Sequence, residues 1–307
     1  MRIAIFGRNI NPVFYDSLKR LFAILHLHGV DVTVYRPFLE YMRSEINFDA
    51  RTITDFSNHN ELRNVDFFFS IGGDGAFLEA ISLVRDSGIP MVGINSGRLG
   101  FLADVAQEEL ESSLEQFFAE KYFLQPRSLI RLENDLGLFS EFPYALNEFT
   151  VHKQDTSQMI TVHVEVGGDY LNSYWADGLI VSTPTGSTAY SLSVGGPIIT
   201  PTAANFIIAP IAPHNLAIRP VVIPDSEEIK LMVEGRGERY MASLDSRSDA
   251  FGSDIEMRLR KANFSINVLQ FDNQSFYSTL RNKLMWGIDK RNCLKLAHTW
   301  EFLIFIR

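Results

Sequence analysis

A glycine-rich turn with one acidic side chain is the first place where residue types and spacing could do chemistry. It reads Gly72-Gly73-Asp74-Gly75 and stands between a short apolar run and a helical pattern. Glycines at the carboxyl end of a strand let backbone amides and a helix N-terminus approach phosphate groups. The Asp74 carboxylate could act there as general base toward a hydroxyl nucleophile, or bind Mg²⁺. A tight turn in which Asp74 only caps the helix is the alternative.

A second turn, residues 95–101 with the sequence Asn-Ser-Gly-Arg-Leu-Gly-Phe, follows the next apolar run. Because the carboxyl ends of parallel strands meet at one edge of a sheet, we expect the two turns to line a crevice. A plain connection between strand and helix is the alternative. Neither turn has the GxGxxG spacing of a dinucleotide fingerprint or the GxxxxGK[ST] spacing of a P-loop, which disfavours an ordinary dehydrogenase and a P-loop NTPase.

Three further groups of polar residues lie in the second half of the chain. Asn147 and Glu148 end an apolar run and could offer an amide to a heteroaromatic base and a carboxylate to a ribose diol. The triplet Ala176-Asp177-Gly178 precedes a strand. Residues 183–190 form a turn of small hydroxyl residues whose polar groups could bind a base, ribose or phosphate, and Tyr190 adds a ring face. Taken singly, each group is also typical of a solvated strand end or a hairpin loop.

The elements that must position these residues change character along the chain. In the first half, apolar runs alternate with helical spacing, which is the βαβ rhythm of a parallel sheet. The segment 36–63 has mixed polarity and is predicted to be irregular or partly helical. From 129 to 269, short β-rich runs recur between glycine turns, so we expect a sandwich or stacked sheets. The expected strands are 2–6, 30–35, 65–71 and 89–94, and the expected helices are 14–25, 76–85 and 107–120.

We therefore predict an α/β N-terminal domain with a parallel sheet plus a β-rich C-terminal domain, in keeping with 307 residues at roughly 150 per domain. Residues 1–125 form the α/β domain, and a helical pattern within 271–291 returns to complete it. Residues 126–270 form the β-rich domain. The tail 292–307, apolar at 300–306, is left unassigned.

Taken together, these motifs occur in the order and spacing of one known family. The turn at 72–75, the Asn147-Glu148 pair, the Asp177 triplet and the segment 183–197, which ends Ser-Val-Gly-Gly-Pro, carry the match. From residue 2 to about 291 the sequence resembles a bacterial NAD kinase, which phosphorylates the adenosine-ribose 2′-hydroxyl of NAD to give NADP. The resemblance implies the two-domain fold that NAD kinases share with diacylglycerol kinases. The segment 183–197 is specific, whereas the glycine-aspartate turn also occurs in lipid kinases and phosphofructokinases.

The resemblance implies that NAD lies between the two domains, with Asp74 as general base on the adenosine ribose. Asn147 and Thr188 would then contact the adenine, and Glu148 the other ribose. Asp177, Ala189 and Ser193 would contact the nicotinamide end. The implied phosphate loop is Gly72, Gly73 and Gly75, and the implied NAD-binding residues are Asp74, Gly75, Phe101, Asn147, Glu148, Trp175, Asp177, Thr188, Ala189, Tyr190, Ser193, Ala212 and Asp245.

Family members use ATP, or in some lineages polyphosphate, with a divalent metal, which we predict to be Mg²⁺ in this protein. They assemble as homodimers or homotetramers, in which Ala212 would face a partner subunit. Two departures from the pattern weaken phosphate binding. Ala76 stands where a threonine usually follows the turn, and Trp175 replaces a basic residue. Neutralisation of the phosphates must then come from metal, the helix dipole or other basic residues.

Composition excludes several other classes. Lys plus Arg number 28 against 37 Asp plus Glu, and the net charge of −9 argues against nucleic acid as a partner. One cysteine and no apolar run of about twenty residues indicate a cytoplasmic protein without a membrane span. A diacylglycerol-type lipid kinase, disfavoured by the charge, and a non-catalytic NAD(P)-binding sensor, disfavoured by Asp74, are the alternative functions.

Overall fold

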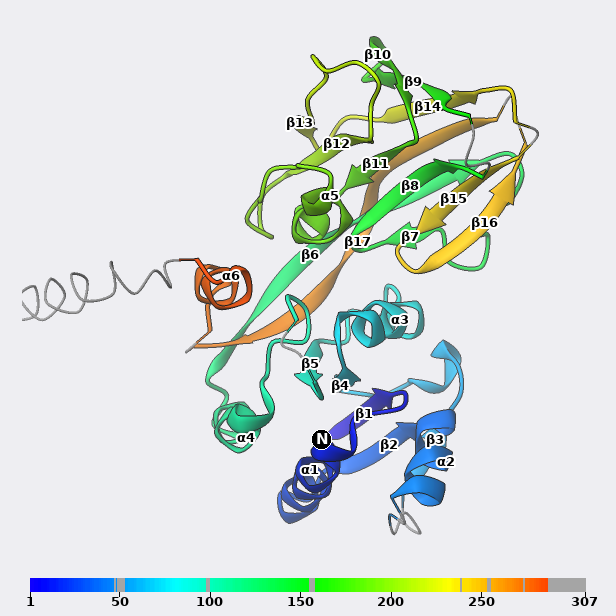
Figure 1. Cartoon of the computed structure of the whole chain (residues 1–307). Coiled ribbons are helices and arrows are strands. Elements are labelled where there is room, and N and C mark those ends of the chain that lie inside the picture. The colour runs from blue at the N-terminus through cyan, green and yellow to red at the C-terminus, as the bar shows by residue number, and fades with distance from the viewer. Residues whose placement is uncertain are drawn as a thin grey trace, which may run out of the picture.

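The structure is a computed structural model that describes residues 1–286 except 47, 49–52, 98–99, 155–157, 238, 253–254 and 273 (Figure 1). The tail 292–307 lies outside the described residues, as do Arg98 and Leu99 of the second turn.

The N-terminal half is a parallel sheet with helices on both faces, which confirms the predicted βαβ rhythm. Strands pair in the order β5-β4-β1-β2-β3. Side chains alternate in β1, so that Ile3 and Ile5 pack toward α1 while Ala4 and Phe6 pack toward α3. Its elements are β1 (Arg2–Gly7), α1 (Tyr15–Leu27), β2 (Asp31–Tyr35), α2 (Arg36–Glu45), β3 (Thr54–Phe56), β4 (Phe67–Gly72), α3 (Asp74–Val84), β5 (Met91–Asn95) and α4 (Leu110–Phe118), with short 3₁₀ turns at Pro12–Phe14, His59–Glu61 and Gln107–Glu109.

The segment 36–63 is partly helical, as predicted, because it contains α2. It also contains the edge strand β3, which the sequence did not predict. Three residues are too few to display the period-two pattern by which a strand is recognised.

The C-terminal half consists of two stacked antiparallel layers, which confirms the expected β-rich architecture. One layer has the strand order β13-β12-β11-β8-β15-β16. Phe149 and Val151 of this layer pack against Val162, Val164 and other side chains of the facing strands, forming the second core. Its elements are β7 (Tyr144–Ala145), β8 (Glu148–Lys153), β9 (Ile160–Val166), β10 (Asp169–Ala176), β11 (Gly178–Ser182), η4 (Thr185–Thr188), α5 (Tyr190–Ser193), β12 (Asn205–Ile211), β13 (Val221–Pro224), β14 (Ile229–Glu234), β15 (Tyr240–Leu244) and β16 (Arg247–Phe251).

Two long strands join the halves into one eleven-stranded sheet (Figure 1). β6 (Tyr122–Asn134) and β17 (Glu256–Phe271) pair antiparallel, with a register shift between Lys261 and Ser265. β17 also pairs with β5 of the parallel part and with β14 of the antiparallel part. The proposed boundaries at 125 and 270 therefore fall inside these strands, and the connection between the halves is a ladder of backbone hydrogen bonds.

The chain then returns toward the N-terminal half through α6 (Phe276–Leu284). Ser275 and Ser278 form a capping box that fixes where the helix begins, and Leu280 is buried. Among the described residues, no helix is long and apolar enough to span a membrane.

Candidate active site

The two glycine-rich turns lie side by side at the carboxyl edge of the parallel sheet, as predicted. Gly72 at the end of β4 is in register with Asn95 at the end of β5, and the Ser96 amide donates to the Gly72 carbonyl at 3.2 Å. Asp74 starts α3, but its side chain does not cap that helix, so the capping alternative is wrong. Its carboxylate reaches across to the second turn instead.

Three backbone amides hold the Asp74 carboxylate. Oδ2 accepts from the Phe101 amide at 2.9 Å, and Oδ1 accepts from the amides of Leu102 and Ala103 at 3.0 and 3.1 Å. A carboxylate offers about four lone-pair positions. The amides leave one position on Oδ2, so this oxygen can still accept a proton.

Gly100 is required by the same arrangement. A Cβ atom built on Gly100 would overlap Asp74 Oδ1, so only glycine lets the turn approach the carboxylate this closely. The sequence marked Gly100 as a turn residue, but its partner becomes visible only in three dimensions.

Lys283 of α6 is a site residue that sequence reasoning missed. Its Nζ atom lies 4.0 Å from Asp74 Oδ2 and 4.9 Å from the centroid of the Phe101 ring. Lys283 follows Phe101 by 182 positions in the chain. The helical pattern at 276–284 was the signal, but it did not say which face of α6 would meet the turns.

The C-terminal half brings its own predicted motifs together. Asp245, in a left-handed conformation with φ 53°, accepts the amides of Leu146, Asn147 and Glu148 at 2.8–3.2 Å. The turn at 183–190 packs on the same segment, because the Thr183 amide donates to the Asn147 carbonyl at 2.9 Å. The Asp245 carboxylate thus positions Asn147 and Glu148 by binding their backbone amides.

Glu148 has an unusual ionisation. Burial, together with the nearby Asp245 carboxylate, raises the pKa of its carboxyl to about 8, although a hydrogen bond from the Tyr190 backbone opposes the shift. One carboxyl oxygen of Glu148 is buried without a hydrogen-bond partner. A buried acceptor of this kind is suited to a ligand that brings hydroxyl donors.

Asp177 and Tyr190 lie close to two basic residues of β8 that the sequence did not single out. Lys153 Nζ is 2.5 Å from an Asp177 carboxylate oxygen. The His152 ring stacks on Tyr190 with a centroid separation of 5.8 Å, and burial lowers the pKa of His152. Strand pairing places Gly178 opposite His152, which explains why these side chains meet.

Thr188, Ala189 and Ser193 belong to the short helical turns η4 and α5 after β11. The Thr188 hydroxyl donates to the Thr185 carbonyl at 3.2 Å, and the Ala189 amide donates to the Gly186 carbonyl at 2.8 Å. Ser193 is the last residue of α5 and is exposed.

Trp175 and Ala212 lie at the outer margin of this region. The Trp175 ring contacts His214 at a centroid distance of 4.4 Å and is 51% exposed. Ala212 is exposed in a left-handed conformation directly after β12.

A buried polar connection runs between the two halves of the site. Burial raises the pKa of Asp104 to about 7 and lowers that of Arg127 to about 10, while each charge opposes the other's shift. Arg127 reaches the Thr185 hydroxyl at 3.5 Å, and Gln270 donates to Asp104 at 3.2 Å. The charge of Asp74 also acts on Asp104. The glycine turns and the 183–190 turn are therefore near neighbours.

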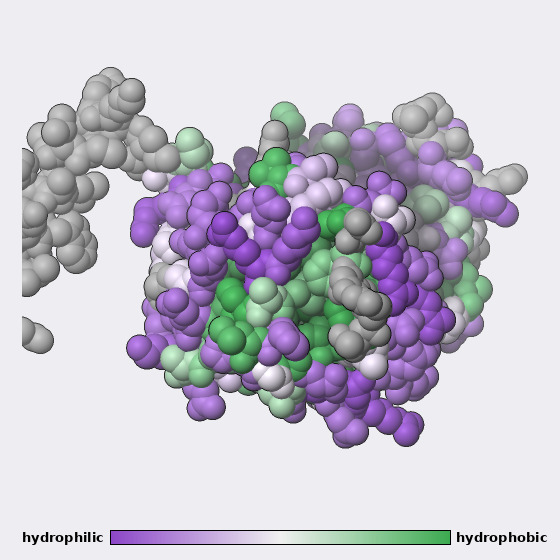
Figure 2. All heavy atoms as spheres, turned by 90° about the horizontal axis from the view of Figure 1, so that it is seen from below, coloured by the Kyte–Doolittle hydropathy of each residue, from purple (hydrophilic) through white to green (hydrophobic). Residues whose placement is uncertain are grey.

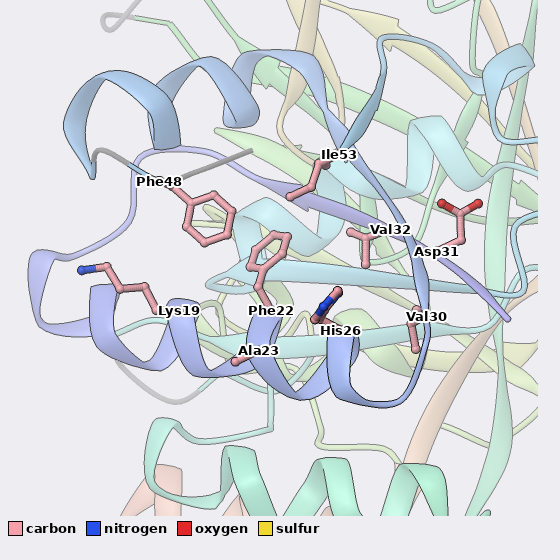
Figure 3. A pocket seen from close by; sticks show the side chains of 9 residues that line it. All are labelled: Lys19, Phe22, Ala23, His26, Val30, Asp31, Val32, Phe48 and Ile53. Atoms are coloured by element: carbon pink, nitrogen blue, oxygen red, sulfur yellow. The ribbon is translucent and has the colours of Figure 1, made fainter. Parts of the chain in front are cut away.

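A hollow of about 370 Å³ lies elsewhere, between α1, β2 and the segment after α2 (Figure 3). Figure 3 shows Phe22, Phe48 and Ile53 pointing into it, with Lys19 and Asp31 at its ends. Figure 2 shows apolar side chains gathered on the face of the N-terminal half seen from below. None of the residues that line the hollow belongs to the predicted site.

Family models and known proteins match this chain in both of its halves. The family model described as ATP-NAD kinase N-terminal domain matches residues 3–122, and the ATP-NAD kinase C-terminal domain matches 146–270. The NAD kinase of Flavobacterium psychrophilum is 46% identical over 95% of this chain and its whole length, and that of Cytophaga hutchinsonii is 44% identical over the same shares. The crystal structure of an NAD kinase from Archaeoglobus fulgidus in complex with ATP is 26% identical, with a TM-score of 0.73 over 93% of this chain and 99% of that one.

The two family models cover most of the chain, and each of the two relatives aligns over 95% of it. The resemblance inferred from the motifs is confirmed, and the lipid kinase and sensor alternatives are wrong. The chain belongs to the NAD kinase family and phosphorylates NAD to NADP.

Proposed function

We propose that the chain transfers the terminal phosphoryl group of ATP to the adenosine-ribose 2′-hydroxyl of NAD, with Asp74 as general base. The observation that carries this proposal is the Asp74 carboxylate, which three amides fix at the glycine-rich turns with one lone pair left on Oδ2. A fixed base within hydrogen-bond reach of a hydroxyl is what proton transfer needs. The ATP complex of the Archaeoglobus relative supports ATP as donor.

The C-terminal half would hold the dinucleotide. Glu148 and Asp177 would accept hydrogen bonds from ligand donors, Asn147 and Thr188 would lie at the adenine, and Tyr190 would offer its ring face. Asp245 keeps these groups in place through the amides of residues 146–148.

The resemblance implies a divalent metal, and Mg²⁺ is proposed. Within the described ranges, no three or more His, Cys, Asp and Glu side chains are grouped so as to hold a metal ion. Mg²⁺ in phosphate-transfer sites is commonly bound by few carboxylates and by the substrate phosphates. We therefore assign no residue to the metal, which would arrive on the donor phosphates and neutralise part of their charge.

Incubation of the purified protein with NAD, Mg²⁺ and either ATP or polyphosphate tests the donor. Detection uses an NADP-specific dehydrogenase. NADP is expected in the reaction with ATP. NADP that forms with polyphosphate but not with ATP would contradict the proposed donor.

The affinity for NAD is expected to rise with pH up to about pH 8. Because the pKa of Glu148 is raised to about 8, its carboxyl is protonated below that pH and must lose the proton to accept two ribose hydroxyls. The dissociation constant should fall by up to about tenfold per pH unit between pH 6 and 8 and then level off. Titration calorimetry from pH 6 to 9 measures this.

Glu148→Gln is the control, because a glutamine does not titrate. Its binding should be weaker by about 1.5 to 3 kcal/mol at pH 8.5 and nearly independent of pH. An affinity in the wild type that is flat or that falls as pH rises would rule out an ionised Glu148 in the complex.

We also propose that the protein is a homodimer or homotetramer. Trp175 is 51% exposed, and Leu216, which follows Ala212 by four residues in the chain, is 88% exposed. Exposed apolar side chains of this kind are suited to a partner subunit. Light scattering should give at least twice the 34.8 kDa of one chain. Leu216→Glu should lower this mass, whereas Leu27→Glu on α1, at 82% exposure, should leave it unchanged. A wild-type mass of one chain would refute the assembly.

A further inference from the structure

We propose that Lys283 is a catalytic residue, whose ammonium group binds the phosphoryl group as it passes from ATP to the ribose. This inference rests on the proposed function. Lys283 Nζ lies 4.0 Å from Asp74 Oδ2, the carboxylate oxygen that keeps a lone pair. The hydroxyl that gives its proton to that oxygen must attack phosphorus within a few ångströms of it. A cation beside this oxygen is therefore beside the reacting phosphoryl group.

The contacts of Lys283 are too weak for a purely structural role. Its separation from Asp74 is at the limit for an ion pair, and the two side chains are 30% and 32% exposed. Ion pairs this exposed contribute little to stability. The Phe101 ring, 4.9 Å from Nζ, holds the ammonium by a cation–π contact at the second turn without using its hydrogen bonds. All three N–H donors can therefore turn to a phosphate.

Three other basic residues near the site have different partners within the part of the chain that the structure describes. Lys153 is paired with Asp177, and Arg8 is paired with Glu79 on α3. Arg127 is buried behind the turns beside Asp104. Ala76 on α3 brings no hydroxyl to the first turn. Lys283 supplies positive charge directly at Asp74.

The chemistry of the step makes that charge effective. The 2′-hydroxyl oxygen forms a bond to the terminal phosphorus of ATP as the bond from that phosphorus to the ADP oxygen breaks, and the hydroxyl proton passes to Asp74 Oδ2. Negative charge is spread over the oxygens of the phosphoryl group in transfer. Lys283 would donate hydrogen bonds to these oxygens and keep its own protons. A preplaced cation lowers the barrier because it need not reorganise as the charge develops.

Lys283→Met tests the proposal, with Arg281→Met as the matched control on an exposed position of the same helix. Lys283→Met is expected to lower kcat with ATP by about 10²- to 10³-fold, with KM for NAD within about threefold and an unchanged melting temperature. Arg281→Met should keep wild-type values.

Lys283→Cys treated with 2-bromoethylamine restores an ammonium of nearly the original length. At least a tenfold recovery of kcat is expected, and wild type treated in the same way controls for the native Cys293. A kcat for Lys283→Met within threefold of wild type would overturn the proposal. The proposal would also be overturned if Lys283→Met lost both kcat and melting temperature while aminoethylated Lys283→Cys recovered no kcat. Wild-type protein that makes no NADP would instead refute the proposed function itself.

Discussion

Asp74→Asn is expected to lower kcat for NADP formation by about 10² to 10⁴-fold while changing the affinity for NAD only a few-fold. An asparagine can keep its carbonyl oxygen at the amides of Leu102 and Ala103, so the turn stays in place. Its NH₂ group then occupies the position of Oδ2, where it faces the Phe101 amide and has no lone pair for a proton. Steady-state kinetics gives kcat, and calorimetry with NAD gives the affinity.

The lost hydrogen bond from Phe101 must be separated from the lost base. This hydrogen bond is only partly buried, so its loss should cost about 0.5 to 1.5 kcal/mol of stability, and the melting temperature of the variant is measured beside its kinetics. A variant that keeps turnover within a few-fold of wild type would exclude Asp74 as the base. Loss of NAD binding equal to the loss of kcat would make Asp74 a binding residue instead.

Gly100→Ala is expected to impair catalysis nearly as much, by about 10²-fold in kcat, although the carboxylate itself is retained. The added Cβ would overlap Asp74 Oδ1, so either the carboxylate or the turn must move. A misplacement of about 1 Å in a reacting group can cost 10²-fold in rate. Turnover at saturating NAD and ATP measures the effect.

Gly97→Ala is the matched control, since it lies in the same turn and its Cβ would meet nothing within 4 Å. Wild-type turnover is expected for this variant. If Gly100→Ala were also as active as wild type, the close approach of the turn to Asp74 would have no part in catalysis.

The motifs were sufficient to predict the family and the position of Asp74 in the fold. Gly72-Gly73-Asp74-Gly75 follows a buried strand, and this local arrangement placed Asp74 at the correct edge of the sheet. The contact of Asp74 with residues 101–103 could not be predicted from the sequence. An aspartate at this position can accept hydrogen bonds either from the amides of its own helix or from the amides of a neighbouring turn. Lys283 could not be predicted either, because its contact with Asp74 depends on where α6 lies after the end of β17.

The sequence indicated most helices and strands, but it did not indicate that two long strands, β6 and β17, connect the two halves of the chain. The β-rich character of 129–269 and the returning helix were visible in apolar periodicity. The length of β6 and β17 was not, because β17 has a register shift between Lys261 and Ser265 and exposed positions that interrupt its pattern. His152 and the Asp104–Arg127 pair were also missed, since their roles depend on burial and on partners in other strands.

A crystal structure of the protein with NAD bound would show whether the adenosine ribose lies at Asp74. We expect the dinucleotide between the glycine-rich turns and the segment 146–148, with the adenosine-ribose 2′-hydroxyl within about 3.2 Å of Asp74 Oδ2. We expect the other ribose at Glu148. An adenosine ribose that lies away from Asp74, or NAD bound in the hollow between α1 and β2, would contradict this arrangement.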